Sequence, residues 1–399
     1  MKKISELYLI IILAFATSCT SDKPVKEGLA YIDATKNYPE KEIFLNDIAD
    51  ITYLYLNSDD DDYLYQGSLN CITENTIVVY DNSSGSILFF TRDGQPKSRF
   101  NRRGQGPEEY NMFFGIIYDE AADDVFVNRR GDMMVYSSTG VYKRTLSLPP
   151  GAFADARTVD FDEHSLFIYD TNREGKRMIS AEADFSEEDN ETPFYLISKT
   201  DGEVLDYVEI PYVPLSLRIN VDGRRIGHLY FTRLLKCSEG ILLSSAETDT
   251  IFLYSHTKSL MPVLYKTPSV NSTNPMKYLN NCLDRGQYQF IEVVTVREGD
   301  ESPVIFPITH YMRNKYTGEV LRPTFLLPDY KGKEFIINPT GIGRIYNDGY
   351  YFELDLIELK QAYRENRLSG KLEELVAKLN EDEDNNVFML LNFFKQAEH

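Results

Sequence analysis

The sequence predicts an all-β protein, a six-bladed β-propeller with four-stranded antiparallel blades. Three observations lead to this prediction. A pattern of apolar strand, glycine turn and apolar strand recurs along the chain, and a further β-rich run precedes most of its copies. Strand-forming aromatic residues are plentiful, with 28 Tyr and 23 Phe among 399 residues. Recurrence of small antiparallel units at a regular spacing is typical of propeller blades.

The recurring hairpin is the main evidence. Its turns centre on Gly94, Gly140, Gly202, Lys258 and Gly318, which lie 46 to 62 residues apart. Glycine supplies the positive φ that tight hairpin turns need, although Lys258 and Ser259 replace it in one copy. The five hairpins span 86–100, 133–148, 194–210, 251–265 and 311–327, and the preceding β-rich runs span 76–81, 124–128, 165–170 and 240–245.

The two ends of the chain are expected to form the sixth blade. Segments 349–357 and 387–394 have strand-like composition near the C-terminus, as does segment 42–56 near the N-terminus. Pairing them closes the ring and removes exposed sheet edges. One amphipathic helix is expected over about 358–380, where Leu372, Leu375, Val376 and Leu379 share a face. We expect this helix to cap the propeller.

The N-terminus carries an export signal. "MKK" is a positive n-region, an apolar stretch follows from Leu7 to Ala16, and "ATSC" ends at Cys19. The stretch is too short for a stable membrane-spanning helix. It resembles a bacterial lipoprotein signal, which implies cleavage before Cys19 and acylation of its thiol, for example with palmitate. The expected division is a signal peptide over 1–18, a lipid-anchored linker over 19–40, and one propeller domain over 41–399.

Charge and cysteine content exclude several classes of function. The formal net charge is −20, so nucleic-acid binding is not expected. Beyond Cys19 the chain has Cys71, Cys237 and Cys282, an odd number without CxxC spacing, which predicts neither a disulfide framework nor a zinc site. We interpret the three as buried, half-hydrophobic thiols.

Segment 101–110, "NRRGQGPEEY", is the crossing from one blade to the next. Two interpretations stand beside each other. Its glycines and Pro107 suit a tight backbone path that locks the blades together. Alternatively, Arg102 and Arg103 face the channel mouth and hold an anionic or hydroxyl-rich ligand through forked donors. We favour the first. The ligand-binding candidates of the second are Arg102, Arg103, Glu108 and Tyr110.

Two segments carry a family resemblance. "GQGPEEY" (104–110) and "LNEDEDNNVFMLLNFF" (379–394) are similar to segments of the six-bladed, NHL-like β-propeller lipoproteins of Bacteroidota. The resemblance covers nearly the whole mature chain. It implies the propeller fold and a place in the cell envelope, as an outer-membrane lipoprotein facing the periplasm or the cell surface. It implies no catalytic residues.

Motifs for catalysis do not emerge from the sequence. The five histidines form no HExxH or similar cluster, and GxSxG does not occur. The acidic runs 59–62 and 119–124 do not match a calcium loop. We therefore predict no cofactor, no metal and no catalytic residue, and a non-enzymatic module that binds a glycan or a protein partner. Two alternatives remain open, a carbohydrate hydrolase or lyase at the channel mouth, and a docking subunit of an outer-membrane complex.

Overall fold

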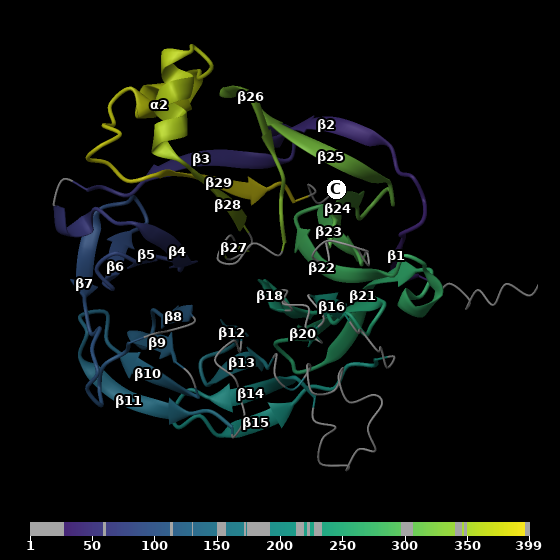
Figure 1. Ribbon diagram of the computed structural model, residues 1–399, viewed down its shortest axis with the longest axis horizontal. Helices are drawn as coiled ribbons and strands as arrows, with labels where there is room; N and C mark the ends of the chain where they lie inside the picture. The colour runs from purple at the N-terminus through teal and green to yellow at the C-terminus, as the bar shows by residue number, and fades with distance from the viewer. Residues whose placement is uncertain are drawn as a thin grey trace, which may run out of the picture.

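A computed structural model shows the chain as a ring of six β-sheets (Figure 1). It describes residues 28–58, 61–111, 115–129, 131–149, 157–170, 173, 192–212, 219–221, 224–226, 234–296, 306–339, 345–346 and 349–395. Cys19 and the whole of segment 1–27 lie outside these residues. The prediction of a six-bladed propeller is confirmed.

The first three blades each use four strands in chain order, with the first strand at the central channel and the fourth at the rim (Figure 1). Blade 1 contains β4 (Gly67–Ile72), β5 (Thr76–Asp81), β6 (Ile87–Thr91) and β7 (Pro96–Phe100). Blade 2 contains β8 (Gly115–Asp119), β9 (Asp124–Asn128), β10 (Asp132–Tyr136) and β11 (Tyr142–Ser147). Blade 3 contains β12 (Arg157–Asp160), β13 (Ser165–Tyr169), β14 (Phe194–Ser198) and β15 (Val204–Tyr207).

The last three blades also recruit strands from the N-terminus. Blade 4 contains β18 (Leu234–Cys237), β19 (Gly240–Leu243), β20 (Thr250–Ser255) and β21 (Leu260–Thr267), with β1 (Ala30–Asp33) outside them. Blade 5 contains β22 (Lys277–Arg285), β23 (Tyr288–Thr295), β24 (Ile308–Asn314) and β25 (Val320–Leu327), with β2 (Glu40–Phe44) and β26 (Tyr330–Phe335). Blade 6 contains β27 (Ile345–Tyr346), β28 (Gly349–Leu354), β29 (Val387–Phe393) and β3 (Ala49–Tyr55).

The expected ring closure is confirmed, because β3 pairs with β29 along its whole length in antiparallel register. Two features differ from the sequence-based expectation. Strand β1 lies within the segment assigned to a linker and pairs in parallel with β21. Segment 42–56 is two strands in different blades, since β2 pairs in parallel with β25 and only β3 belongs to blade 6. A two-stranded ribbon, β16 (Ile219–Val221) with β17 (Arg224–Ile226), forms a sheet of its own.

The helix expected over about 358–380 is two helices, α2 (Leu356–Arg364) and α3 (Gly370–Val376). Asn366 adopts a positive φ of 53°, which ends α2, and Leu368 then forms a β-bridge with Tyr330. The apolar face was predicted correctly: Leu372 and Val376 are fully buried against blades 5 and 6.

The hydrophobic core is divided into six main clusters, one between each pair of neighbouring blades. Because the strands alternate, each blade presents one apolar face to the blade before it and one to the blade after it. Cys237 and Cys282 are buried in the cluster between blades 4 and 5. Stability is therefore spread around the ring, and the first strands lie on its inner side (Figure 1).

Candidate functional site

A chain of charged side chains lies where the first strands of blades 2, 3 and 4 finish. We call this the hairpin end of the channel, because each first strand turns there into the second. Asp119 is the last residue of β8 and Asp160 the last of β12, so the fold places both carboxylates at this end. Lys236, the third residue of the four-residue strand β18, joins them from the next blade.

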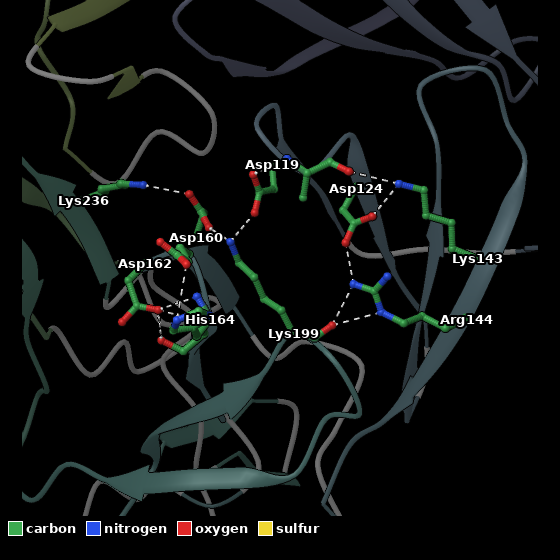
Figure 2. Close-up of polar contacts among 12 residues, drawn as sticks. Asp119, Asp124, Lys143, Arg144, Asp160, Asp162, His164, Lys199 and Lys236 are labelled. Carbon is green, nitrogen blue, oxygen red and sulfur yellow. Dashed lines mark hydrogen bonds and ion pairs between the residues drawn. The ribbon is translucent and has the colours of Figure 1, made fainter.

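Lys199 connects the two carboxylates. It follows β14 directly, and its ammonium group lies 2.5 Å from Asp119 Oδ2 and 2.8 Å from Asp160 Oδ1 (Figure 2). Lys236 Nζ approaches Asp160 Oδ2 from the other side at 3.1 Å. Burial would lower the pKa of Lys199, but hydrogen bonds and charges from the two aspartates outweigh it, and the pKa is raised. The lysine is therefore charged at neutral pH.

A second group of charges extends the network toward the rim of blade 2. Arg144 and Lys143 of β11 both pair with Asp124. The Arg144 guanidinium also donates from Nε and Nη2 to the Lys199 carbonyl oxygen, at 3.1 and 2.8 Å (Figure 2). These contacts hold the pKa of Asp124 below its usual range, although burial alone would raise it. The outer strand of blade 2 thereby fixes the turn that carries Lys199.

The same position is basic in two other blades. Lys315 follows β24 and lies 2.6 Å from Asp284 Oδ1. Arg92 follows β6, and its guanidinium lies 5.6 Å from the centre of the Tyr346 ring of blade 6. A basic residue directly after the third strand thus reaches toward a first strand in blades 1, 3 and 5. The three basic residues can be found in the sequence. Which first strand each side chain contacts depends on the packing of the blades, which the sequence does not show.

The charged side chains at the hairpin end differ in their exposure to solvent. The Lys199 side chain is 8% exposed, whereas the Asp160 and Lys236 side chains are 31% and 39% exposed. A solute at the hairpin end can therefore meet Asp160 and Lys236, whereas Lys199 is shielded from solvent and holds Asp160 through an ion pair. Cys71, near the same groups, has its pKa raised to about 12 by burial, which leaves its thiol protonated and weakly nucleophilic.

Two further residues in Figure 2 have a local structural role. The Asp162 Oδ1 atom accepts hydrogen bonds from the amides of His164 and Ser165 and from the Ser165 hydroxyl. These bonds lower the pKa of Asp162 against the effect of burial. The His164 imidazole is itself largely exposed, and the group shapes the turn between β12 and β13.

The ligand-binding candidates from the sequence lie in segment 101–110, at the opposite end of β8 from Asp119. Arg102 Nε donates to the Gly140 carbonyl oxygen of blade 2 at 2.9 Å. Tyr110 is buried, and its hydroxyl donates to the Gly85 carbonyl oxygen of blade 1 at 2.9 Å. The Glu108 carbonyl oxygen accepts from the Tyr136 hydroxyl at 3.0 Å. Arg103 is exposed, and the stem of its side chain packs against Gly85.

These contacts join blade 1 to blade 2 through Arg102 and Tyr110, while the Arg103 and Glu108 side chains face solvent. The structure brings none of the four to the hairpin end. The sequence reasoning did not find Asp119, Asp160, Lys199 or Lys236. Among the described residues, no group of three or more His, Cys, Asp or Glu is arranged to hold a metal ion. Within the same residues, the helices are too short or too polar to span a bilayer.

Comparison with known proteins agrees with the fold. The sequence profile of the family described as 6-bladed beta-propeller (DUF5128) matches residues 21–202, a little under half of the chain. No curated protein matches the sequence.

Two of the solved structures that resemble this chain come from the genus Bacteroides. A Bacteroides fragilis protein described as exported has a TM-score of 0.60 at 14% identity, over 92% of this chain and all of that one. A member of the DUF4221 family from Bacteroides vulgatus has a TM-score of 0.44 at 11% identity, over 87% of this chain and 96% of that one. At 14% identity the likeness to the Bacteroides fragilis protein concerns the fold alone.

Proposed function

We propose that this chain, a six-bladed β-propeller of the Bacteroidota type, is a cell-envelope lipoprotein that binds a ligand or partner without transforming it. The binding site that we propose is the hairpin end of the channel, around Asp160 and Lys236. The observation that carries this proposal is the partial exposure of these two opposite charges beside a buried, charged Lys199 that pairs with Asp160.

The arrangement suits recognition of a polar ligand. An exposed carboxylate and an exposed ammonium group offer one strong acceptor and one strong donor side by side. Both side chains are held on a rigid framework. Each comes from the first strand of its blade, and the ion pairs of Lys199 connect blades 2 and 3. Rigid, pre-positioned donors and acceptors reduce the entropy lost on binding. A hydroxyl-rich glycan or a polar peptide segment fits this chemistry.

The same cluster is poorly arranged for glycoside hydrolysis. General acid catalysis needs a carboxyl group that can give up a proton to the leaving group. Here a lysine ammonium group lies within 3.1 Å of each of the two carboxylates. Both oxygens of Asp160 and one oxygen of Asp119 are thereby engaged by ammonium groups, so the arrangement suits binding better than proton donation to a leaving group.

Thermal unfolding tests the channel site. A protein lacking residues 1–20 is heated with oligosaccharides, short peptides and divalent ions, and a ligand at about 100 times its Kd adds about 2.7 kcal/mol of stability. We expect a glycan or peptide to raise Tm, and Lys236→Met to abolish that rise. Lys143→Met removes an equal charge from the rim side of the network, and this variant should keep the ligand-induced rise in Tm.

Each other result counts against a part of the proposal. If no ligand in the panel raises Tm, or if both lysine variants respond alike, the hairpin end is not the site. If Arg102→Ala or Arg103→Ala abolishes the rise and Lys236→Met does not, binding occurs at segment 101–110. Mass spectrometry of the ligand after incubation completes the test, because a cleaved product would replace the binding proposal with a carbohydrate-active enzyme.

We further propose that residues 1–18 are removed as a signal peptide and that Cys19 is acylated. The segment between Cys19 and β1 would then join the lipid to the outer edge of blade 4, where β1 pairs with β21. Cells fed an alkyne analogue of palmitate should label the wild-type protein. Cys19→Ser should lose the label, and Cys71→Ser should keep it. Equal labelling of the two variants would exclude Cys19 as the modified residue.

A further inference from the structure

A groove with a volume of about 390 Å³ lies on the rim of the propeller. Its walls come from the ends of β2 and β25, from β26, and from the connection between α2 and α3. Figure 1 shows β26 and α2 at the outer edge of the ring, on the far side of blades 5 and 6 from the first strands. The groove is thus separate from the channel, and a role for it does not depend on ligand binding at the hairpin end.

The floor of the groove is apolar. Phe44, the last residue of β2, is 46% exposed in a position where its ring lines the groove. Leu326 and Pro328 lie beside it, and Tyr330 is buried beneath. A volume in this range suits a small molecule or a few side chains.

The charged residues that line the groove are all basic, namely Lys331, Lys333 and Arg367. This stands out in a chain with a net charge of −20. The Arg367 guanidinium and the Lys333 ammonium group lie 5.5 and 6.0 Å from the centre of the Tyr330 ring. The aromatic ring therefore positions two of the three cations.

The present partners of these cations are exposed and exchangeable. Lys333 Nζ lies 2.6 Å from Glu358 Oε2, and Arg367 Nε lies 2.7 Å from Glu365 Oε2. Both pairs are open to solvent, which screens them. Within the described part of the chain, the Lys331 ammonium group has no hydrogen bond or ion pair, although its amide donates to the Arg367 carbonyl oxygen at 2.8 Å.

We propose that this groove binds a carboxylate carried on an apolar or aromatic body. The body would cover the Phe44 ring and the neighbouring leucine, and the carboxylate would lie between Lys331 and Arg367. A guanidinium fork and an ammonium group are complementary to a carboxylate. The occupant that we propose is a free organic acid, because the volume of the groove suits a small molecule. An acidic residue beside an aromatic one in a peptide has the same chemistry and is the alternative that the test distinguishes.

Calorimetry with small probes tests the proposal. The probes are 4-phenylbutyrate, its uncharged analogue 4-phenylbutanol, and the peptide acetyl-Phe-Glu-amide. One charge-assisted contact corresponds to about tenfold in affinity, so we expect 4-phenylbutyrate to bind about tenfold more tightly than the alcohol. The peptide arm separates the sources: tighter binding of the peptide than of 4-phenylbutyrate identifies a peptide ligand, and the reverse identifies a free acid.

A matched pair of double variants locates the binding. Lys331→Ser with Arg367→Ser removes two positive charges from the groove and should weaken 4-phenylbutyrate binding about tenfold or more. Lys371→Ser with Arg364→Ser removes the same charge from the same two-helix segment, outside the lining residues, and should leave binding unchanged. Equal affinity for the acid and the alcohol, or equal loss in both double variants, would overturn the proposal.

Discussion

At the residue scale, the glycine of the recurring hairpin has two roles. Gly94, Gly140 and Gly202 each adopt a φ between 82° and 85° in the turn between the third and fourth strands. A Cβ atom at these positions would also lie 2.0 to 2.6 Å from an atom of the preceding blade's outermost strand. The repeat seen in the sequence therefore marks a blade-to-blade contact as well as a turn.

Gly318 allows the two roles to be separated. It has a φ of 72°, but no atom lies within 4 Å of the position of a Cβ. We expect Gly318→Ala to lower the free energy of unfolding by about 1 kcal/mol through backbone strain alone. Gly94→Ala meets the Tyr55 carbonyl oxygen at 2.0 Å as well, and should cost about 2 kcal/mol more. Urea unfolding of both variants measures the difference.

Lys258 provides the reverse control, because it occupies the same turn position in blade 4 with a φ of 57°. Lys258→Gly removes the strained Cβ and should raise the free energy of unfolding by up to about 1 kcal/mol. If Gly318→Ala and Gly94→Ala lower the free energy of unfolding equally, backbone strain alone explains the glycines and contact with the neighbouring blade does not.

At the scale of elements, the N-terminal segment forms a belt, which we define as β1, β2 and β3 (residues 30–55). It passes along the rim of blades 4, 5 and 6 in turn (Figure 1). Its first two strands add a parallel partner to a blade that already has four strands, and its third supplies the outermost strand of blade 6. The belt therefore reinforces two blades and completes a third.

Truncation should reveal this division. A chain that begins at residue 36 lacks β1 and the fully buried Ile32, and should lose about 2 to 4 kcal/mol of stability while unfolding in one transition. A chain that begins at residue 57 lacks β3 as well and leaves β29 as an open edge, so it should aggregate. Thermal unfolding and size-exclusion chromatography measure both effects. A monomeric, cooperatively unfolding chain from residue 57 would show that blade 6 closes without the belt.

The belt also shows what local sequence can predict. Hairpins such as β6–β7 were predictable because alternation, a glycine turn and a second strand occur within fifteen residues. Strand β1 has four residues and pairs with a strand more than 230 residues away, so no local pattern identifies it. The candidate site has the same difficulty, since Lys199 meets Asp119 across 80 residues. A single lysine after a strand carries no signal until the neighbouring blade is in place.

At the scale of the whole molecule, two electrostatic effects compete as the pH falls. The excess negatively charged side chains, which give a net charge of −20, repel one another, and protonation of carboxylates relieves that repulsion. Against this, several turns depend on ionised carboxylates. Burial alone would raise their pKa values, but hydrogen bonds from hydroxyl and amide groups outweigh it and lower the pKa values of Asp81, Glu120, Asp162 and Asp384.

We expect the second effect to dominate below about pH 4.5. A carboxyl group with a lowered pKa in the folded state contributes stability above its unfolded pKa, here 3.8 for Asp and 4.5 for Glu. That contribution is lost as the pH falls toward the lower, folded value. The free energy of unfolding, measured with urea, should therefore vary little from pH 7 to 5 and then decrease. A rise below pH 4.5 would mean that relief of repulsion is the larger effect.

Asp81 isolates one such carboxylate. It accepts hydrogen bonds from the hydroxyls of Ser83 and Ser84 and from the Gln66 amide, so Asp81→Asn removes the charge on which the turn between β5 and β6 depends. The variant should be less stable than the wild type at pH 7, and the difference should shrink as the pH falls, because the wild-type carboxyl group becomes neutral too. Asp201→Asn is the matched comparison. Hydrogen bonds from Ser198 and the Glu203 amide lower the pKa of Asp201 too, but its site is fully exposed to solvent, so we expect a smaller pH-dependent difference than for Asp81→Asn. If the difference in free energy of unfolding between the wild type and Asp81→Asn stays constant with pH, the loss of stability comes from altered shape and not from the lost charge.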